Sequence, residues 1–240
     1  MTWLWRICFS LPWLLPASGA TVTGSVELTD SREAAVRKHR DFSAVVVWLE
    51  PADGQARAAL RLDPVRARMV QKDKRFSPHI LAVPRGSTVD FPNFDPIFHN
   101  AFSNFSGQVF DIGLYPPGTN RTVTFQRSGI VRVFCNIHPT MSAVIVVLNT
   151  PWYAVTRASG EYEIHNVPAG EYRLRVFHER ATEDRLRALE RRVEVDGSPV
   201  ALPPLLISET GYLPTPHKNK YGRDYPPVPD DHGTYMGGKK

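Results

Sequence analysis

Short runs of β-branched and aromatic residues, separated by proline and glycine turn signals, recur along most of the chain and limit the folds open to it. The 240 residues include 21 prolines and 16 glycines, a content that favours many turns over long helices. Up to residue 150 the runs follow one another at the spacing typical of a Greek-key β-sandwich. We therefore expect an all-β fold, with strands over residues 22–28, 44–49, 68–72, 79–83, 87–91, 109–114, 121–125, 130–134 and 142–148.

A second and smaller β-unit is expected to begin near Thr150-Pro151. With about sixty residues it would have only a limited core, so we expect it to lean on the first unit. The charged stretches 31–41 and 179–189 are expected to be exposed connections or short helical turns. Strands of this unit are expected over residues 153–156, 162–165, 172–177, 189–195 and 202–208.

These patterns divide the chain into four parts. Residues 1–20 are interpreted as a signal peptide, 21–149 as the first β domain with an N-terminal extension, and 150–210 as the second β-sandwich. Residues 211–240 form a tail rich in proline and glycine. This tail has hardly any aliphatic side chains to bury, so it is expected to be disordered or draped over the surface.

The first twenty residues have the layout of a secretory signal. Arg6 is their only charge, residues 7–15 are mostly apolar, and small residues at 17–20 offer a cleavage site. An uncleaved anchor is the alternative, whereas no other stretch has the length of a transmembrane helix. The mature chain is therefore expected in the periplasm or outside the cell, without a transmembrane segment.

Cleavage would remove Cys8 and leave Cys135 as the one cysteine, which excludes an internal disulfide. A lone thiol in an oxidising compartment is a liability unless it is buried, reactive or bound to metal. The formal net charge is +5, but no concentrated Lys/Arg patch is interleaved with aromatic residues. Nucleic acid is therefore not an expected partner.

Cys135, His138 and Met141 follow the expected strand 130–134 at three-residue steps. Pro139 and the flanking strands oppose a helix, so a loop that wraps around a metal ion explains this spacing best. His99 follows another expected strand and can supply a second imidazole. Two imidazoles, one thiolate and a weak axial thioether are the ligand set of an electron-transfer copper site.

Zinc is the main alternative metal, because one cysteine and two histidines leave a fourth position open. Methionine is a poor zinc ligand, and no carboxylate is suitably placed to act as a catalytic base, which favours copper. A dinuclear copper centre would need a second bridging thiolate, and Cys135 has no such partner in the mature sequence.

His99-Asn100, followed after 36 residues by Cys-x2-His-x2-Met, resembles the cupredoxins, the plastocyanin and amicyanin family of blue copper proteins. The similarity covers roughly residues 69–148, and the short ligand loop is most similar to that of amicyanin. It implies one type 1 copper ion with His99, Cys135 and His138 as equatorial ligands and Met141 as the axial ligand. Asn100 would tie the two ligand loops together.

The same resemblance implies that the ring edge of His138 is the electron gateway. An apolar docking patch would surround it, formed by Ile137, Pro139, Pro96 and Phe98. Small and transient interfaces suit a carrier that must release its partner quickly.

The segment 160–174, with Gly160-Glu161-Tyr162 and Pro168-Ala169-Gly170-Glu171-Tyr172, resembles the carboxypeptidase regulatory-like domain. That domain is a transthyretin-like or starch-binding-like β-sandwich found as an accessory unit. The resemblance spans about residues 151–208 and implies support or interaction, with carbohydrate as one ligand class, and no peptidase activity.

The function expected from the sequence is that of an exported electron carrier without substrate turnover. Some chains of this composite layout are labelled methylamine-utilisation proteins, so a cytochrome or a quinoprotein dehydrogenase is the redox partner that the resemblance implies. Two alternatives stay open: a non-redox copper-binding or delivery protein, and an extracellular carbohydrate- or protein-binding β-module.

Overall fold

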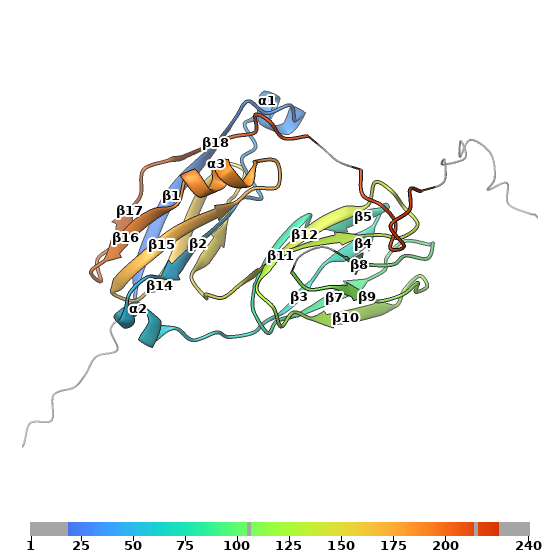
Figure 1. Cartoon of the computed structure of the whole chain (residues 1–240), viewed down its shortest axis with the longest axis horizontal. Coiled ribbons are helices and arrows are strands. Elements are labelled where there is room, and N and C mark those ends of the chain that lie inside the picture. The colour runs from blue at the N-terminus through green and yellow to red at the C-terminus, as the bar shows by residue number, and fades with distance from the viewer. Residues whose placement is uncertain (1–18, 105–106, 214–215, 226–240) are drawn as a thin grey trace, which may run out of the picture.

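The computed structural model describes residues 19–104, 107–213 and 216–225, and they form two β-units that lie side by side (Figure 1). The expected all-β class is confirmed, since strands outnumber three short helices among these residues. Residues 1–18, most of the expected signal peptide, lie outside the described residues. In the part of the chain that is described, no helix has the length and apolar character needed to cross a membrane.

The first unit is a sandwich of two sheets. The larger sheet has the strand order β6 (Ile80–Pro84), β12 (Ser142–Leu148), β11 (Gly129–Phe134), β8 (Phe102–Ser103) and β9 (Phe110–Asp111). The smaller sheet has the order β10 (Asn120–Thr124), β7 (Thr88–Pro92) and β3 (Arg66–Arg68), and β4 (Val70–Lys72) pairs with β5 (Arg75–Ser77). Between the sheets lies a core that includes Phe91, Phe125, Val133 and Ile145.

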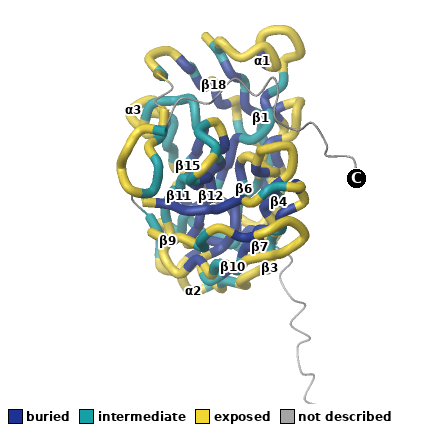
Figure 2. Tube along the Cα trace, turned by 90° about the vertical axis from the view of Figure 1, so that its right-hand side faces the viewer, coloured by how far each residue is buried: buried dark blue, intermediate teal, exposed yellow. Residues whose placement is uncertain are grey.

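Strand β12 is buried on both faces. Ala143, Ile145 and Val147 point into the core of the first unit, whereas Val144 and Val146 pack toward the second unit. Successive side chains of a strand point to opposite faces, so a strand buried on both sides is a continuous apolar run. Burial is concentrated on such strands, and the connecting loops are exposed (Figure 2).

The second unit contains two further sheets. One joins β1 (Ala20–Thr29) to β14 (Glu161–Val167), β17 (Val200–Ala201) and β18 (Leu205–Ser208). The other has the order β13 (Tyr153–Val155), β2 (Val46–Pro51), β15 (Gly170–Phe177) and β16 (Arg191–Val195). The helices are α1 (Ala34–His39), α2 (Gly54–Ala59) and α3 (Glu183–Ala188).

Strand pairing departs from the expected grouping of residues 21–149. Strand β1 pairs with β14 and β18, and β2 pairs with β13 and β15, so both N-terminal strands lie in the second unit. Val22, Val26 and Leu49 are buried in one core together with Ile164 and Leu174. The physical reason is core size, because the strands after residue 150 bury too little surface by themselves and the N-terminal strands complete their core.

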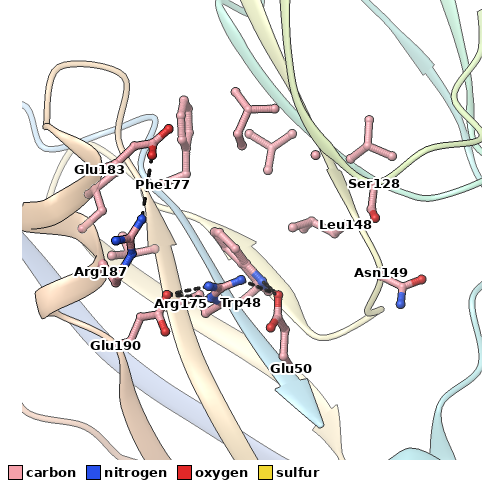
Figure 3. A pocket seen from close by; sticks show the side chains of 16 residues that line it. Trp48, Glu50, Ser128, Leu148, Asn149, Arg175, Phe177, Glu183, Arg187 and Glu190 are labelled. Atoms are coloured by element: carbon pink, nitrogen blue, oxygen red, sulfur yellow. Dashed lines mark hydrogen bonds and ion pairs between the residues drawn. The ribbon is translucent and has the colours of Figure 1, made fainter. Parts of the chain in front are cut away.

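A third apolar cluster joins the two units. Val46 and Phe177 of the second unit pack with Ile80, Val144 and Val146 of the first. Beside this cluster lies a cavity of about 390 Å³, with Trp48 and Arg175 on one side and Leu148 on the other (Figure 3). Arg175 forms ion pairs with Glu50 at 3.3 Å and with Glu190 at 2.7 Å, so the charges in this wall are mutually satisfied.

Candidate metal centre

The segment from Cys135 to Met141 is the tight loop between β11 and β12. Its ends are joined, since the N–H of Cys135 donates to the carbonyl of Met141 at 3.1 Å. Inside it, the N–H of Met141 donates to the carbonyl of His138, also at 3.1 Å. The loop therefore places Cys135 and Met141, both buried, at the base and His138, which is half-buried, nearer the surface.

His99 reaches the same place from the loop between β7 and β8. Its backbone exchanges two hydrogen bonds with Tyr115, at 3.2 and 2.9 Å, which fixes the chain on either side of the imidazole. Tyr115 is itself buried, and its phenol donates to the carbonyl of Phe91 at 2.8 Å. His99 is thus attached to the end of β7, on the same end of the sandwich as the Cys135 loop.

Three donor atoms converge in this region. The sulfur of Cys135 lies 3.5 Å from Nδ1 of His138 and 3.9 Å from Nδ1 of His99. The ligand atoms of the three residues all lie within 4.8 Å of one another. Sulfur and nitrogen atoms that share one tetrahedral ion, at about 2.3 and 2.1 Å from it, are separated by roughly 3.6 Å. The two sulfur-to-nitrogen distances lie near that value, so Cys135 and each of the two imidazoles are placed to share one metal ion.

Met141 shares the buried core of Cys135 and shows no exposed surface. It ends the ligand loop, and its backbone carbonyl accepts the N–H of Cys135. A soft thioether and a thiolate beside two imidazoles favour copper over harder cations.

The electrostatics of Cys135 reflect two opposing effects. Burial raises the pKa of the thiol, while backbone N–H groups of Ile137, Asn100 and His138 lower it by donating toward the sulfur. The net pKa is raised, so the metal-free protein holds a thiol at neutral pH. Binding of a metal would displace that proton, because the thiolate is the form that ligates.

His138 is neutral at neutral pH. Burial, together with the charge of His99 when that ring is protonated, lowers the pKa of His138 to about 4. The rings of His99 and His138 lie 4.8 Å apart between centroids. A neutral imidazole is the form that donates to a metal ion, so no proton competes at this position near pH 7.

Asp95 orients His99, a role that the sequence analysis missed. Nε2 of His99 lies 2.6 Å from Oδ2 of Asp95, on the opposite side of the ring from the atom that faces Cys135. The same carboxylate accepts the backbone N–H groups of Asp73 and Lys74. Burial raises the pKa of Asp95, but the hydrogen bonds from Lys74, His99 and Asp73 outweigh it and leave the pKa lowered. The available signal was an acid four residues before His99.

Asn100 bridges the two ligand loops. Its Oδ1 accepts the backbone N–H of Asn136 at 3.3 Å, and its Nδ2 donates to Asp111 at 2.8 Å. Each of these asparagines directly follows a candidate ligand, so the bond links His99 and Cys135 through their neighbours.

Apolar side chains are exposed on the two loops that hold the candidate ligands. Of the residues named from the sequence, Ile137 is 42% exposed, Phe98 is 54% exposed, Pro96 is exposed and Pro139 is half-buried. Two further large apolar side chains that were not expected are exposed: Phe94 in the loop that holds His99, and Leu114 in the connection between β9 and β10.

Residues of the tail also reach the ligand loop. The phenol of Tyr225 donates to the carbonyl oxygen of Cys135 at 2.7 Å, and the backbone N–H of Lys220 donates to Oδ1 of Asn136 at 3.0 Å. The ring of His217 stacks on that of Phe134.

Comparisons with known proteins add partial likenesses. No family model matches the sequence, and no curated protein matches it. Among solved structures, a purple cupredoxin from Nitrosopumilus maritimus is 24% identical, with a TM-score of 0.31 over 34% of this chain and 99% of that chain. Amicyanin from Paracoccus versutus is 19% identical, with a TM-score of 0.32 over 42% of this chain and 97% of that chain.

A copper-containing nitrite reductase from Thermus scotoductus SA-01 is 26% identical, with a TM-score of 0.34 over 41% of this chain. The match spans only 27% of the length of that reductase. The solved structures that resemble part of this chain thus include cupredoxins and an enzyme. Each likeness covers less than half of the chain. The candidate metal centre is therefore described by its own distances and contacts.

Proposed function

We propose that this chain binds one type 1 copper ion and carries single electrons between redox proteins. The observation that supports this most directly is the convergence of Cys135 Sγ with Nδ1 of His99 and of His138, all within 4.8 Å. A buried thiolate with two imidazoles and a buried methionine is a donor set suited to copper. In the proposal, His99, Cys135 and His138 are the equatorial ligands and Met141 is axial.

The residues of the site have separate tasks in this proposal. Cys135 supplies the thiolate, and the backbone N–H groups that point at its sulfur stabilise the negative charge. Asp95 holds His99 in the tautomer that leaves Nδ1 free. Burial of His99, Cys135 and Met141 keeps water away from the donors. Bound copper would supply the one-electron change between Cu(II) and Cu(I).

His138 is the proposed path for electrons, because it is the candidate ligand that reaches the surface. The exposed side chains of Phe98, Ile137 and Phe94 lie on the loops around it and would form the docking patch. An apolar contact of this kind, without a large buried area, favours rapid release of the partner. We propose a redox protein such as a cytochrome or a quinoprotein dehydrogenase as that partner, and a carrier rather than an enzyme as the role.

We further propose that the chain is exported after removal of residues 1–20, in keeping with Cys135 as its one buried thiol. The second unit would then be an accessory β-sandwich of the carboxypeptidase regulatory-like type. Its packing against β6 and β12 supports a scaffolding role for it.

A visible absorption spectrum of the mature protein after addition of Cu(II) tests the proposed function. An intense blue band from sulfur-to-copper charge transfer is expected, and it should bleach on reduction with ascorbate and return on reoxidation. A colourless or redox-inactive complex would refute the assignment. Equal binding of zinc with no coloured copper form would favour the zinc alternative.

A further inference from the structure

Residues 216–225, here called the C-terminal strap, contact the start of the ligand loop. They belong to the tail 211–240, which was expected to be disordered or draped over the surface; Figure 1 shows residues 216–225 at the far end of the first unit, and residues 226–240 lie outside the described residues. The strap contacts three consecutive residues of the first unit. His217 stacks on Phe134 with ring centroids 4.2 Å apart, Tyr225 bonds the carbonyl of Cys135, and Lys220 bonds the side chain of Asn136.

The strap completes the hydrogen bonding of Cys135. The N–H of Cys135 is taken by Met141, at the other end of the loop. The carbonyl of Cys135 is taken by the phenol of Tyr225, at 2.7 Å and 90 residues further along the chain. Both backbone polar groups of the candidate thiolate ligand are therefore fixed, one from inside the loop and one from the strap. Tyr225 is in turn held edge-on against the ring of His217.

The strap also closes a ring of hydrogen bonds through both ligand loops. Asn136 donates its N–H to Asn100, and Asn100 donates to Oδ1 of Asp111. The ammonium of Lys220 donates to Oδ2 of Asp111 at 2.7 Å, and the backbone N–H of Lys220 returns to Asn136 at 3.0 Å. Two of the four members directly follow His99 and Cys135 in the chain. Movement of either ligand loop would break at least one bond of this ring.

We propose that the C-terminal strap is a structural part of the metal centre, with Tyr225 and Lys220 as positioning residues. They hold the Cys135 loop in the geometry that brings the donors together before any metal binds. This goes beyond the proposed function, because it assigns the loop's rigidity to a segment outside both β-units. The expected effect of the strap on metal retention rests on the proposed function. Its expected effect on amide exchange in the metal-free loop does not.

Amide hydrogen exchange in the metal-free, full-length protein tests the proposal directly. Tyr225→Phe removes only the hydroxyl, which donates to the carbonyl of Cys135 and lies 3.2 Å from Nδ1 of His217. A triple variant, His217→Ala with Lys220→Met and Tyr225→Phe, releases the strap. Tyr221→Phe is the matched control, since Tyr221 lies in the same strap but is 71% exposed. Loss of one net hydrogen bond should speed exchange of the 135–141 amides by roughly 3- to 10-fold, and the triple variant should exceed this.

A second measurement follows the transfer of Cu(I) from the protein to a chromophoric chelator. Release should be about tenfold faster in the triple variant than in the Tyr221→Phe control, as is usual when a group that orients a ligand is lost. Unchanged loop exchange in both strap variants would overturn the proposal, whatever the metal does. Because exchange is measured without metal, failure to bind copper would refute the proposed function and leave the strap result standing.

Discussion

Nε2 of His99 donates to Oδ2 of Asp95 at 2.6 Å, while Nδ1 of the same ring lies 3.9 Å from the sulfur of Cys135. One nitrogen of the imidazole thus bonds the carboxylate, and the other points toward the candidate metal centre. A histidine held in this way presents its lone pair in a fixed direction, which is what a rigid metal site requires.

Asp95→Asn should weaken both the site and the fold. Asp95 uses both oxygens to accept three donors, His99 and the N–H groups of Asp73 and Lys74, and an amide offers only one oxygen. We expect Cu(I) affinity to fall by about tenfold, measured by chelator competition. We also expect a loss of about 1–3 kcal/mol in the free energy of unfolding of the metal-free protein. Asp73→Asn is the control, because the side chain of Asp73 is exposed.

Cys135→Ser should abolish the blue colour while leaving the loop folded. Serine nearly matches the shape of cysteine, but its hydroxyl does not ionise at neutral pH and provides no sulfur-to-copper charge transfer. The visible spectrum after Cu(II) addition reports the colour, and circular dichroism reports the fold. Persistence of the band in this variant would mean that another group gives rise to it.

Met141→Leu should keep copper bound and raise the reduction potential. The side chain of Met141 is buried, and leucine fills a similar volume, so the free energy of unfolding should change by less than about 1.5 kcal/mol. Loss of the thioether removes electron donation that favours Cu(II), and the axial ligand tunes the potential. Cyclic voltammetry of both proteins measures the shift. An unchanged potential would argue against axial ligation by Met141.

His79 should make the contact between the two units depend on pH. Its Nε2 lies 2.5 Å from Glu179 of the second unit, and its Nδ1 lies 3.1 Å from the carbonyl of Ser142. The hydrogen bond with Glu179 raises the pKa of His79 and outweighs the opposing effect of burial. The protonated form satisfies both partners, so its stabilising contribution is complete below about pH 6.5, the usual pKa. This contribution is lost as the pH rises through the raised pKa of His79 in the folded protein.

Urea unfolding of the wild type and of His79→Gln measures this contribution. The difference in free energy of unfolding should be largest near pH 6 and should shrink toward pH 9. It should be about 0.2–1 kcal/mol, since the side chain of His79 is 48% exposed. At acid pH the pair is lost again, because Glu179 takes up a proton. Burial raises the pKa of Glu179, but its hydrogen bond with His79 outweighs that effect and leaves the pKa lowered.

Other charges near His79 are common to both proteins. Arg132 and Arg180 face the same carboxylate, and burial lowers the pKa of His178, which gives the opposite pH dependence. These effects cancel in the difference between the wild type and the variant. His165→Gln, which removes an exposed histidine from β14, is the control. A difference between wild type and His79→Gln that is constant with pH would contradict the assignment.

The strands were largely predictable because their side-chain pattern is local. The continuous run from Ala143 to Leu148 marks a strand buried on both faces, and β12 is one. Pairing was not predictable in the same way. Val22, Val26 and Leu28 show that residues 20–29 have a buried face, but that pattern does not say which sheet covers it.

The candidate ligands were also visible in the sequence, because three of them stand in one short loop. The groups that hold them were not. Asp95 lies in a segment whose asparagine and prolines read as a turn, and its hydrogen bonds depend on the β4–β5 hairpin. Tyr225 acts through a backbone carbonyl 90 residues away, a contact that leaves no trace in composition or periodicity.

Because β1 and β2 belong to the second unit, we predict that either core can be destabilised without opening the other. Ile164 of β14 packs in one core with Val22, and Ile145 of β12 packs in the other with Cys135 and Met141. Either isoleucine changed to alanine leaves a cavity and should cost about 2–5 kcal/mol. Ile164→Ala should speed amide exchange in β1 and β14 while the 135–141 loop stays protected, and Ile145→Ala should do the reverse. If Ile164→Ala left β1 protected but exposed the ligand loop, the N-terminal strands would belong with the metal centre after all.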